Sequence, residues 1–191
     1  MGLIILLVII AAVMFWVLSA YNGLIALKNQ VLNAWKQIDV QLKRRHDLIP
    51  NLVNTVKGAM DFERGTLEAV ISARNRAVSA TGVQDTARAE GELTQALGRL
   101  FALTEAYPDL KATGNVAQLQ EELTSTENKI GFARQLYNDL ATQYNTRQMQ
   151  FPTSLVAGMA KASPAELWQI EDAGERAVPV VDLGAPRPPA A

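Results

Sequence analysis

An apolar stretch at the start of the chain constrains the fold most. Between Leu3 and Leu18 there is no polar side chain, and the first charged residue is Lys28. At ~1.5 Å per residue, a helix from Leu3 to Leu24 is ~32 Å long, which matches the ~30 Å hydrocarbon core of a bilayer. We therefore predict a transmembrane anchor at residues 1–27.

A cleaved signal peptide is the alternative interpretation of this stretch. Secretory signals carry positive charge before the apolar run and small residues before the cleavage site. Only Met1 and Gly2 precede the run, and Leu18 occupies a position that should be small for cleavage after Ala20. These features favour an uncleaved anchor. All lysines and arginines follow the span, which favours an N-terminus outside the cell and a cytoplasmic domain.

The anchor continues without a break into an amphipathic helix. Beyond Lys28, apolar residues recur at helical spacing as far as Val56, which predicts a first helix that ends near Met60. Pro50 interrupts this pattern, because proline has no N–H to donate to the carbonyl of His46. We predict a helix kink at His46 and Pro50, with that carbonyl bound by water or by a side chain.

The rest of the chain predicts three more helices and no strand before residue 177. The second covers about residues 63–80 and is stopped by Thr81-Gly82, and the third covers about 84–107. The fourth, at 116–150, has an apolar seam of coiled-coil type that ends at Phe151. The predicted fold class is therefore all-α: the transmembrane helix continues into an antiparallel four-helix bundle with long helices, at residues 28–160.

The C-terminal part is predicted to form one more short helix. Ser163-Pro164-Ala165-Glu166 has the pattern of a capping box with proline at the first helical position, which predicts a helix to about Glu175. Val178–Val181 is predicted to be extended, so residues 161–183 comprise a short helix and an extended segment. The proline-rich residues 184–191 are predicted to form a disordered tail.

The segment after the fourth helix is predicted to return to the membrane surface. The first helix beyond Lys28 and the fourth helix would each be ~50 Å long, so two antiparallel helices bring the chain back to its start. The residues assigned to this membrane interface are Tyr21, Lys28, Leu155, Val156, Met159 and Trp168. The alternative is that these side chains cap the end of the bundle without touching lipid.

Composition excludes several kinds of site. The chain has no cysteine, and its one histidine is His46, so thiolate nucleophiles, zinc–sulfur sites and multi-histidine metal sites are excluded. A net charge of −1 gives no basic surface of the kind that nucleic-acid binding needs. The chain also lacks a glycine-rich phosphate loop and an HExxH motif. We therefore expect no catalytic residue, no cofactor, no metal and no nucleic-acid partner.

Polar residues gather near the predicted kink and along the fourth helix. Buried polar groups in bundles fix the register of the helices, so we predict a structural polar network here. Its members are Arg44, Arg45, Asp47, Asn51, Glu127, Asn128, Arg134 and Asn138. Facing residues of the first and fourth helices are expected to have numbers that sum to about 179, which pairs Asp47 with Arg134. The alternative is that this cluster forms a groove for a ligand or a partner.

Three stretches carry a family resemblance. They are Arg44-Arg45-His46-Asp47-Leu48-Ile49-Pro50-Asn51-Leu52-Val53, Tyr107-Pro108-Asp109-Leu110-Lys111-Ala112 and Glu127-Asn128-Lys129-Ile130. Together with further matches over nearly the whole chain, they resemble the LemA family. The resemblance implies a bacterial single-pass membrane protein with a four-helix bundle and no established enzymatic activity. Residues 59–63 and the tail after Leu183 depart from the family pattern.

These observations favour a non-enzymatic scaffold or adaptor. We expect the protein to contact the lipid bilayer, to self-assemble as a homo-oligomer at the inner membrane and to bind an unidentified protein partner. One alternative is an accessory factor that modulates a membrane partner, such as an envelope-stress protease or a secretion system. A more distant alternative is a hydrolase or a metal-dependent enzyme.

Overall fold

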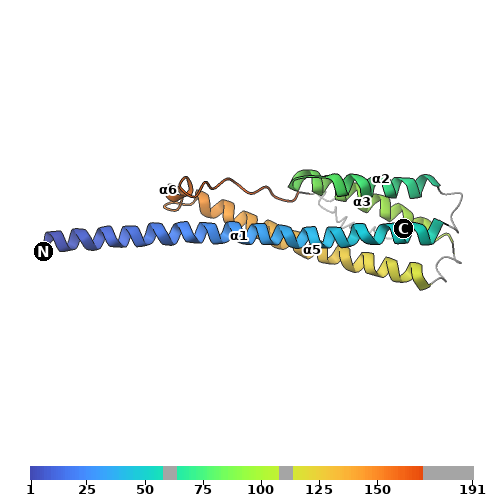
Figure 1. Cartoon of the computed structure of the whole chain (residues 1–191), viewed down its shortest axis with the longest axis horizontal. Coiled ribbons are helices and arrows are strands. Elements are labelled where there is room, and N and C mark those ends of the chain that lie inside the picture. Colours follow the sequence, from blue (N-terminus) through green and yellow to red (C-terminus); the bar gives the residue numbers. More distant parts are fainter. Residues whose placement is uncertain (58–63, 108–113, 170–191) are drawn as a thin grey trace, which may run out of the picture.

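One long helix, α1 (Gly2–Lys57), runs through the whole length of the computed structural model (Figure 1). The structure describes residues 1–57, 64–107 and 114–169. Within these ranges, α1 is followed by α2 (Arg64–Ser79), α3 (Val83–Thr104), α5 (Gly114–Met149) and α6 (Ser154–Ala157). No strand occurs in these three ranges, and the predicted all-α class is confirmed.

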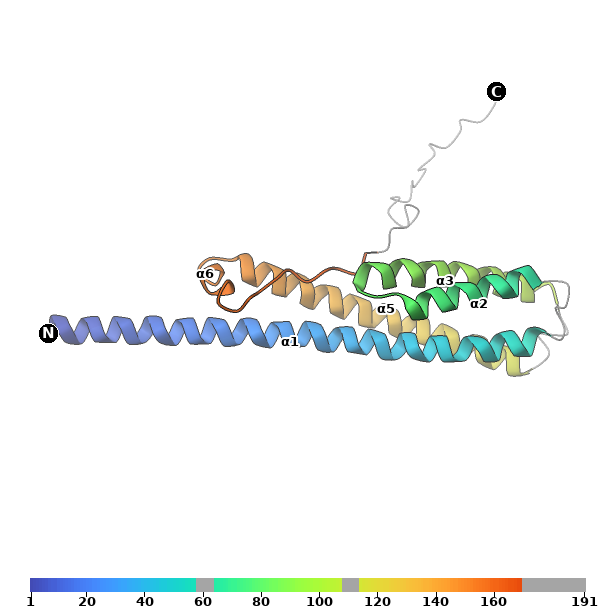
Figure 2. The ribbon, with the colours of Figure 1, turned by 45° about the horizontal axis from the view of Figure 1, so that its top comes forward.

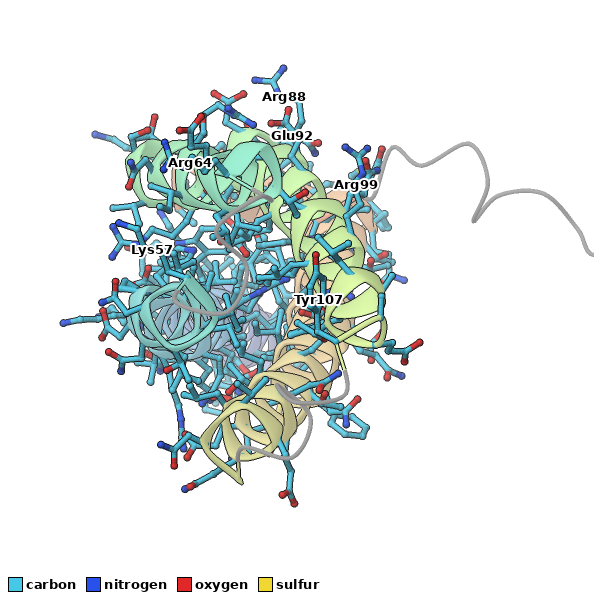
Figure 3. All side chains as sticks on the ribbon, turned by 90° about the vertical axis from the view of Figure 1, so that its right-hand side faces the viewer. Lys57, Arg64, Arg88, Glu92, Arg99 and Tyr107 are labelled. Carbon is cyan, nitrogen blue, oxygen red and sulfur yellow. The ribbon has the colours of Figure 1, made fainter. Side chains whose placement is uncertain are left out.

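The helices α1, α2, α3 and α5 alternate in direction and form the predicted antiparallel bundle (Figure 2). The main pairs are α1 with α5 and α2 with α3, and contacts between α1 and α2 join the two pairs. In Figure 3, viewed from the end opposite the N-terminus, Lys57, Arg88 and Arg99 point outward, whereas Tyr107 lies toward the interior. The predicted stop at Thr81-Gly82 is confirmed, because α2 ends at Ser79 and Gly82 has a left-handed φ of 80°.

The first part of α1 extends beyond the bundle. It contains an 18-residue stretch with a mean hydropathy of 3.0, and none of that stretch is buried. This is the one helix among the described residues that is long and apolar enough to cross a membrane. The first buried residue of α1 is Ala20 and the next is Leu24, which is 1% exposed, so packing starts inside the segment assigned to the anchor.

The interior consists of two apolar clusters. The distal cluster lies at the end opposite the N-terminus and uses all four long helices, with members such as Leu52, Leu93 and Leu100. The proximal cluster lies nearer the N-terminus and is built mainly from α1 and α5, with members such as Ile38 and Tyr144. On α1, Leu42 belongs to the proximal cluster and Ile49 to the distal one, and charged residues lie between them.

An extended segment covers the proximal half of the bundle, where α2 and α3 do not reach (Figure 1). This segment, residues 162–169, is called the strap below. The helix predicted to begin at Ser163 is wrong over these residues, because side chains of α5 bind the backbone groups that a helix would have used. The predictions for residues 170–175, 178–181 and 184–191 lie outside the described residues.

Pro50 lies inside α1 without ending it. The helix continues to Lys57, and neither Figure 1 nor Figure 2 shows a sharp bend, so the predicted kink is wrong. The free carbonyl was correctly expected to find a side chain: Arg74 of α2 donates from Nε to the oxygen of His46 over 3.3 Å. This bond replaces the one that proline removes from the helix.

We expect Arg74→Ala to lower the free energy of unfolding by about 1–3 kcal/mol, because it leaves the His46 carbonyl without its donor. In a Pro50→Ala background the new backbone N–H can bind that carbonyl. The cost of Arg74→Ala should then fall by about 1 kcal/mol in a double-mutant cycle measured by urea unfolding. Equal costs in the two backgrounds would contradict this assignment.

The register of α1 against α5 differs from the prediction. Trp35 packs against Tyr137, and Arg45 lies beside Glu127. The residue numbers in both pairs sum to 172 rather than the predicted 179, a difference of one heptad. The prediction counted from Lys28 as the first residue outside the membrane, but packing already starts at Ala20. Both helices therefore overlap further toward the N-terminus than expected.

Candidate functional site

Four charged or ionisable side chains form a layer between the two apolar clusters. Arg45 of α1 donates from Nη1 to Glu90 Oε2 over 3.1 Å and from Nη2 to Thr94 Oγ1 over 2.7 Å. His46 Nε2 lies 2.6 Å from Glu90 Oε1, and Arg45 Nη1 lies 3.0 Å from Glu127 Oε2. Glu90 and Arg45 are each 3% exposed. We call these four residues, Arg45, His46, Glu90 and Glu127, the charged layer.

The charged layer pairs its own members. The guanidinium of Arg45 lies between two carboxylates, and both oxygens of Glu90 have partners. A buried charge is tolerated when it is paired and hydrogen-bonded in this way. A groove of about 210 Å³ between α3 and α5 borders Arg45 and Glu127. The arrangement therefore fixes the register of α1, α3 and α5. Its most buried charged groups, the Arg45 guanidinium and the Glu90 carboxylate, already have partners.

A second polar constellation lies on α5 and binds the strap. Asn138 accepts from the N–H of Trp168 over 2.8 Å and donates to the carbonyl of the same residue over 3.0 Å. Asn145 makes the same pair of bonds with Ala165, both at 2.8 Å. Tyr137 Oη donates to the Glu166 carbonyl over 2.7 Å. These contacts all involve the strap's backbone.

The spacing of the two asparagines explains why they bind an extended chain. Asn138 and Asn145 are two helical turns apart, or ~10.5 Å along α5. Ala165 and Trp168 are three residues apart, which in an extended chain is ~10 Å. The two repeats match, and the strap runs antiparallel to α5, since the lower-numbered asparagine binds the higher-numbered strap residue. Each asparagine therefore binds one residue of an extended segment.

Trp168 is the main side-chain anchor of the strap. It is 4% exposed and lies against Trp35, with ring centroids 5.9 Å apart. The guanidinium of Arg134 lies over its ring at 5.8 Å, within the range of a cation–π interaction. Burial, and secondarily the carboxylate of Glu166, raises the pKa of the nearby Tyr137 above its ordinary value of 10.0. The Tyr137 hydroxyl therefore keeps the proton that it donates to the strap.

The predicted polar network divides into separate groups. Arg45 and Glu127 belong to the charged layer, and Arg134 and Asn138 bind the strap. The predicted Asp47–Arg134 pair is wrong: Asp47 is exposed, and the one-heptad difference in register moves Arg134 to Trp168.

The other predicted network members lie on the surface. Arg44 is 3.9 Å from Glu122 in an exposed pair. Asn51 is exposed, and its carbonyl accepts from Thr55. Asn128 is exposed and borders grooves between α3 and α5. These three residues are therefore not part of a buried network.

The residues assigned to the membrane interface also divide. Leu155 and Met159 are 68% and 69% exposed, next to the similarly exposed Phe151. Val156 is 2% exposed at the end of the bundle, and Trp168, a residue of the strap, is buried against Trp35, so the interfacial assignment of both is wrong. Tyr21 is 37% exposed and Lys28 is half-buried. Phe151 does not continue the buried seam of α5, because the helix ends at Met149.

Sequence reasoning missed the central residue of each constellation. Glu90 was not singled out, although it lies on the buried face of α3 between Ala87 and Leu93. A charged residue at that position of an apolar stripe is a signal for a buried partner. Asn145 was not singled out either, and its seven-residue spacing from Asn138 was the available signal. Nothing in the local sequence indicated that residues 162–169 would be its ligand.

Comparison with known proteins agrees with this architecture. The sequence profile described as "LemA family" matches residues 34–183. The chain belongs to the LemA family. A protein named "Protein LemA" from Metamycoplasma hominis is 30% identical over 138 residues, which cover 71% of this chain and 63% of that relative. The chain thus spans slightly less than two thirds of that relative's length.

Other relatives in the comparison are named as magnetosome proteins. "Magnetosome protein MamQ 2" from Paramagnetospirillum magneticum is 23% identical over 184 residues, covering 83% of this chain and 68% of the relative. "Magnetosome protein MamQ" from Magnetospirillum gryphiswaldense is 21% identical with the same coverage. With its exposed apolar helix, the chain is a membrane-associated helical protein of the LemA family.

Proposed function

We propose that this LemA-family protein is a non-enzymatic scaffold that self-assembles at the bacterial inner membrane. The observation that carries this proposal is the continuity of α1, which passes from the apolar stretch into the bundle as one helix of 56 residues. At ~1.5 Å per residue it is ~84 Å long, and no flexible linker separates the two parts. The continuous helix therefore holds the bundle in a fixed orientation relative to its anchor. A scaffold that presents its surface to binding partners needs such an orientation.

The charged layer supports a structural rather than a chemical role. His46 and Glu90 are the buried groups best suited to acid–base chemistry, and each binds another member of the layer. Among the described residues, no three His, Cys, Asp or Glu side chains cluster in a way that suits a metal ion. Replacing His46 cannot distinguish a scaffold from an enzyme, because the change also removes a partner of Glu90.

An exposed apolar patch on α1 and α5 supports self-assembly. Val40, Phe132 and Leu136 are 62%, 74% and 42% exposed, and all three line one shallow groove of about 460 Å³. Lys36 and Lys129 border the same groove. Apolar side chains grouped in this way, with charged residues at the rim, are typical of a protein–protein interface. We assign this patch to contact between copies of the chain.

The patch predicts the effect of one substitution. Phe132→Asp places a charge at the most exposed apolar position of this patch and should reduce co-isolation of two differently tagged copies from membranes by about tenfold or more. Val78→Asp is the matched control, because Val78 is 52% exposed on α2 and does not line the groove. The proposal would be contradicted if both variants co-isolate as wild type does.

The orientation and the membrane contact of α6 can be tested together, since the chain has no cysteine. The absence of lysine and arginine before the apolar stretch supports a cytoplasmic bundle. We expect an impermeant maleimide to label Val78→Cys only in inside-out vesicles. Leu155→Cys should react more slowly there than Val78→Cys, despite its greater exposure, if α6 lies in the lipid interface. Labelling of Val78→Cys in intact spheroplasts would contradict the cytoplasmic orientation. Equal labelling rates for Val78→Cys and Leu155→Cys would contradict the contact of α6 with lipid.

A further inference from the structure

The strap is held on α5 by side chains that bind its backbone. The four hydrogen bonds from Asn138 and Asn145 go to backbone N–H and carbonyl groups, as does the bond from Tyr137. Backbone contacts place no demand on the identity of the bound side chains. Side-chain selection comes from the Trp168 pocket, formed by Trp35 and Arg134. The site therefore recognises an extended segment with a tryptophan three residues after a small residue.

The chain itself supplies the segment that fits this description. We infer that copies of the protein exchange straps, so that Ala165–Trp168 of one copy binds the asparagines of a neighbouring copy. This inference rests on the proposed self-assembly and gives it a mechanism. Exchange re-forms every strap contact in the new pairing, which is why swapping identical elements between protomers has a low energetic cost. In the exchanged state, the site of each copy is complete only with a residue from its neighbour.

The connection between α5 and the strap permits the exchange. Residues 150–162 follow the end of α5, and fully extended they would span up to ~43 Å, more than the width of two packed helices. Full extension also releases the buried side chains of Thr153 and Val156 from the end of the bundle. The only helix in this connection is the four-residue α6. The chain reverses at Lys161, a non-glycine residue with a φ of 45°, in the left-handed region that disfavours such side chains. Opening the turn releases this local strain.

The membrane favours the exchange as well. Parallel anchors hold neighbouring sites at the same height and in the same orientation, which raises the effective concentration of one strap near the next groove.

Crosslinking between two tagged copies in one membrane tests the exchange. Gln84 Nε2 donates to the Leu167 carbonyl over 2.7 Å, so Gln84→Cys in one copy (the acceptor) and Leu167→Cys in the other (the donor) report a strap bound across copies. We expect a crosslinked heterodimer with a short bis-maleimide. A single chain with both substitutions should give an internal crosslink, which shows that the chemistry works at this site.

The asparagines give the test an asymmetric control. Asn138→Ala with Asn145→Ala in the acceptor removes hydrogen bonds worth about 1 kcal/mol each and should lower the heterodimer yield tenfold or more. The same changes in the donor weaken its own groove, free its strap and should raise the yield. If the substitutions change the heterodimer yield equally in the acceptor and in the donor, the crosslink reports random collision and strap exchange is overturned.

Co-isolation of the two tags without crosslinker separates this inference from the proposed function. If the tags co-isolate, the internal crosslink forms and no heterodimer is crosslinked, strap exchange is overturned and the scaffold stands. If the tags do not co-isolate, self-assembly is overturned and strap exchange with it.

Discussion

Glu90→Ala is expected to lower the free energy of unfolding by about 3–5 kcal/mol, because it breaks a buried ion pair and removes one of the two carboxylates that neutralise Arg45. Glu90 is 3% exposed, accepts from Arg45 and lies 2.6 Å from His46. Its loss leaves Arg45 with Glu127 and Thr94 only. Urea unfolding of the full chain in detergent, followed by tryptophan fluorescence, measures the change.

Glu92→Ala is the matched control for this prediction. Glu92 lies two residues further along α3 and pairs with Arg76 at 2.9 Å, but both side chains are about half exposed. An exposed pair of this kind contributes about 0–1 kcal/mol, since water screens it. Similar costs for Glu90→Ala and Glu92→Ala would show that the charged layer is not the buried, specific element described here.

Trp168→Ala is expected to release the strap. Removing a buried tryptophan costs about 3–5 kcal/mol, and here the loss falls on the contact of the strap with Trp35 and Arg134. The strap can detach while the helices stay folded, so the effect appears as local opening. Trypsin cleavage after the exposed Lys161 should accelerate about a hundredfold or more under native conditions.

Leu155→Ala is the control for strap release. Leu155 lies at the same end of the molecule but is 68% exposed, so its truncation removes little buried surface. Cleavage after Lys161 should stay within about twofold of wild type in this variant. An unchanged cleavage rate in Trp168→Ala would mean that Trp168 does not hold the strap to α5.

The helices could be predicted from the sequence because their signals are local. The unbroken apolar run and its continuation at helical spacing predicted α1, and Thr81-Gly82 marked the end of α2. The capping-box pattern at Ser163 was equally local, yet it gave the wrong structure. Its backbone groups found better-placed partners on α5, which no pattern within residues 163–166 could reveal.

The sites were harder to predict than the fold because they depend on register. Counting from Lys28 placed Arg134 beside Asp47, whereas the packed helices place it over Trp168. A shift of one heptad keeps the same faces in contact, so the apolar seam alone does not fix it. The charged layer does, since Arg45 can reach Glu90 and Glu127 together in one register. The register could therefore have been predicted only by recognising Glu90 as a buried partner of Arg45, which the sequence analysis did not do.

The mass distribution of the full chain in native lipid nanodiscs tests the central claim most directly. A self-assembling scaffold should give particles with two or more copies, and Phe132→Asp should shift them toward one copy. Val78→Asp should leave the distribution unchanged. Single-copy particles alone, in wild type and at every protein-to-lipid ratio, would contradict the account.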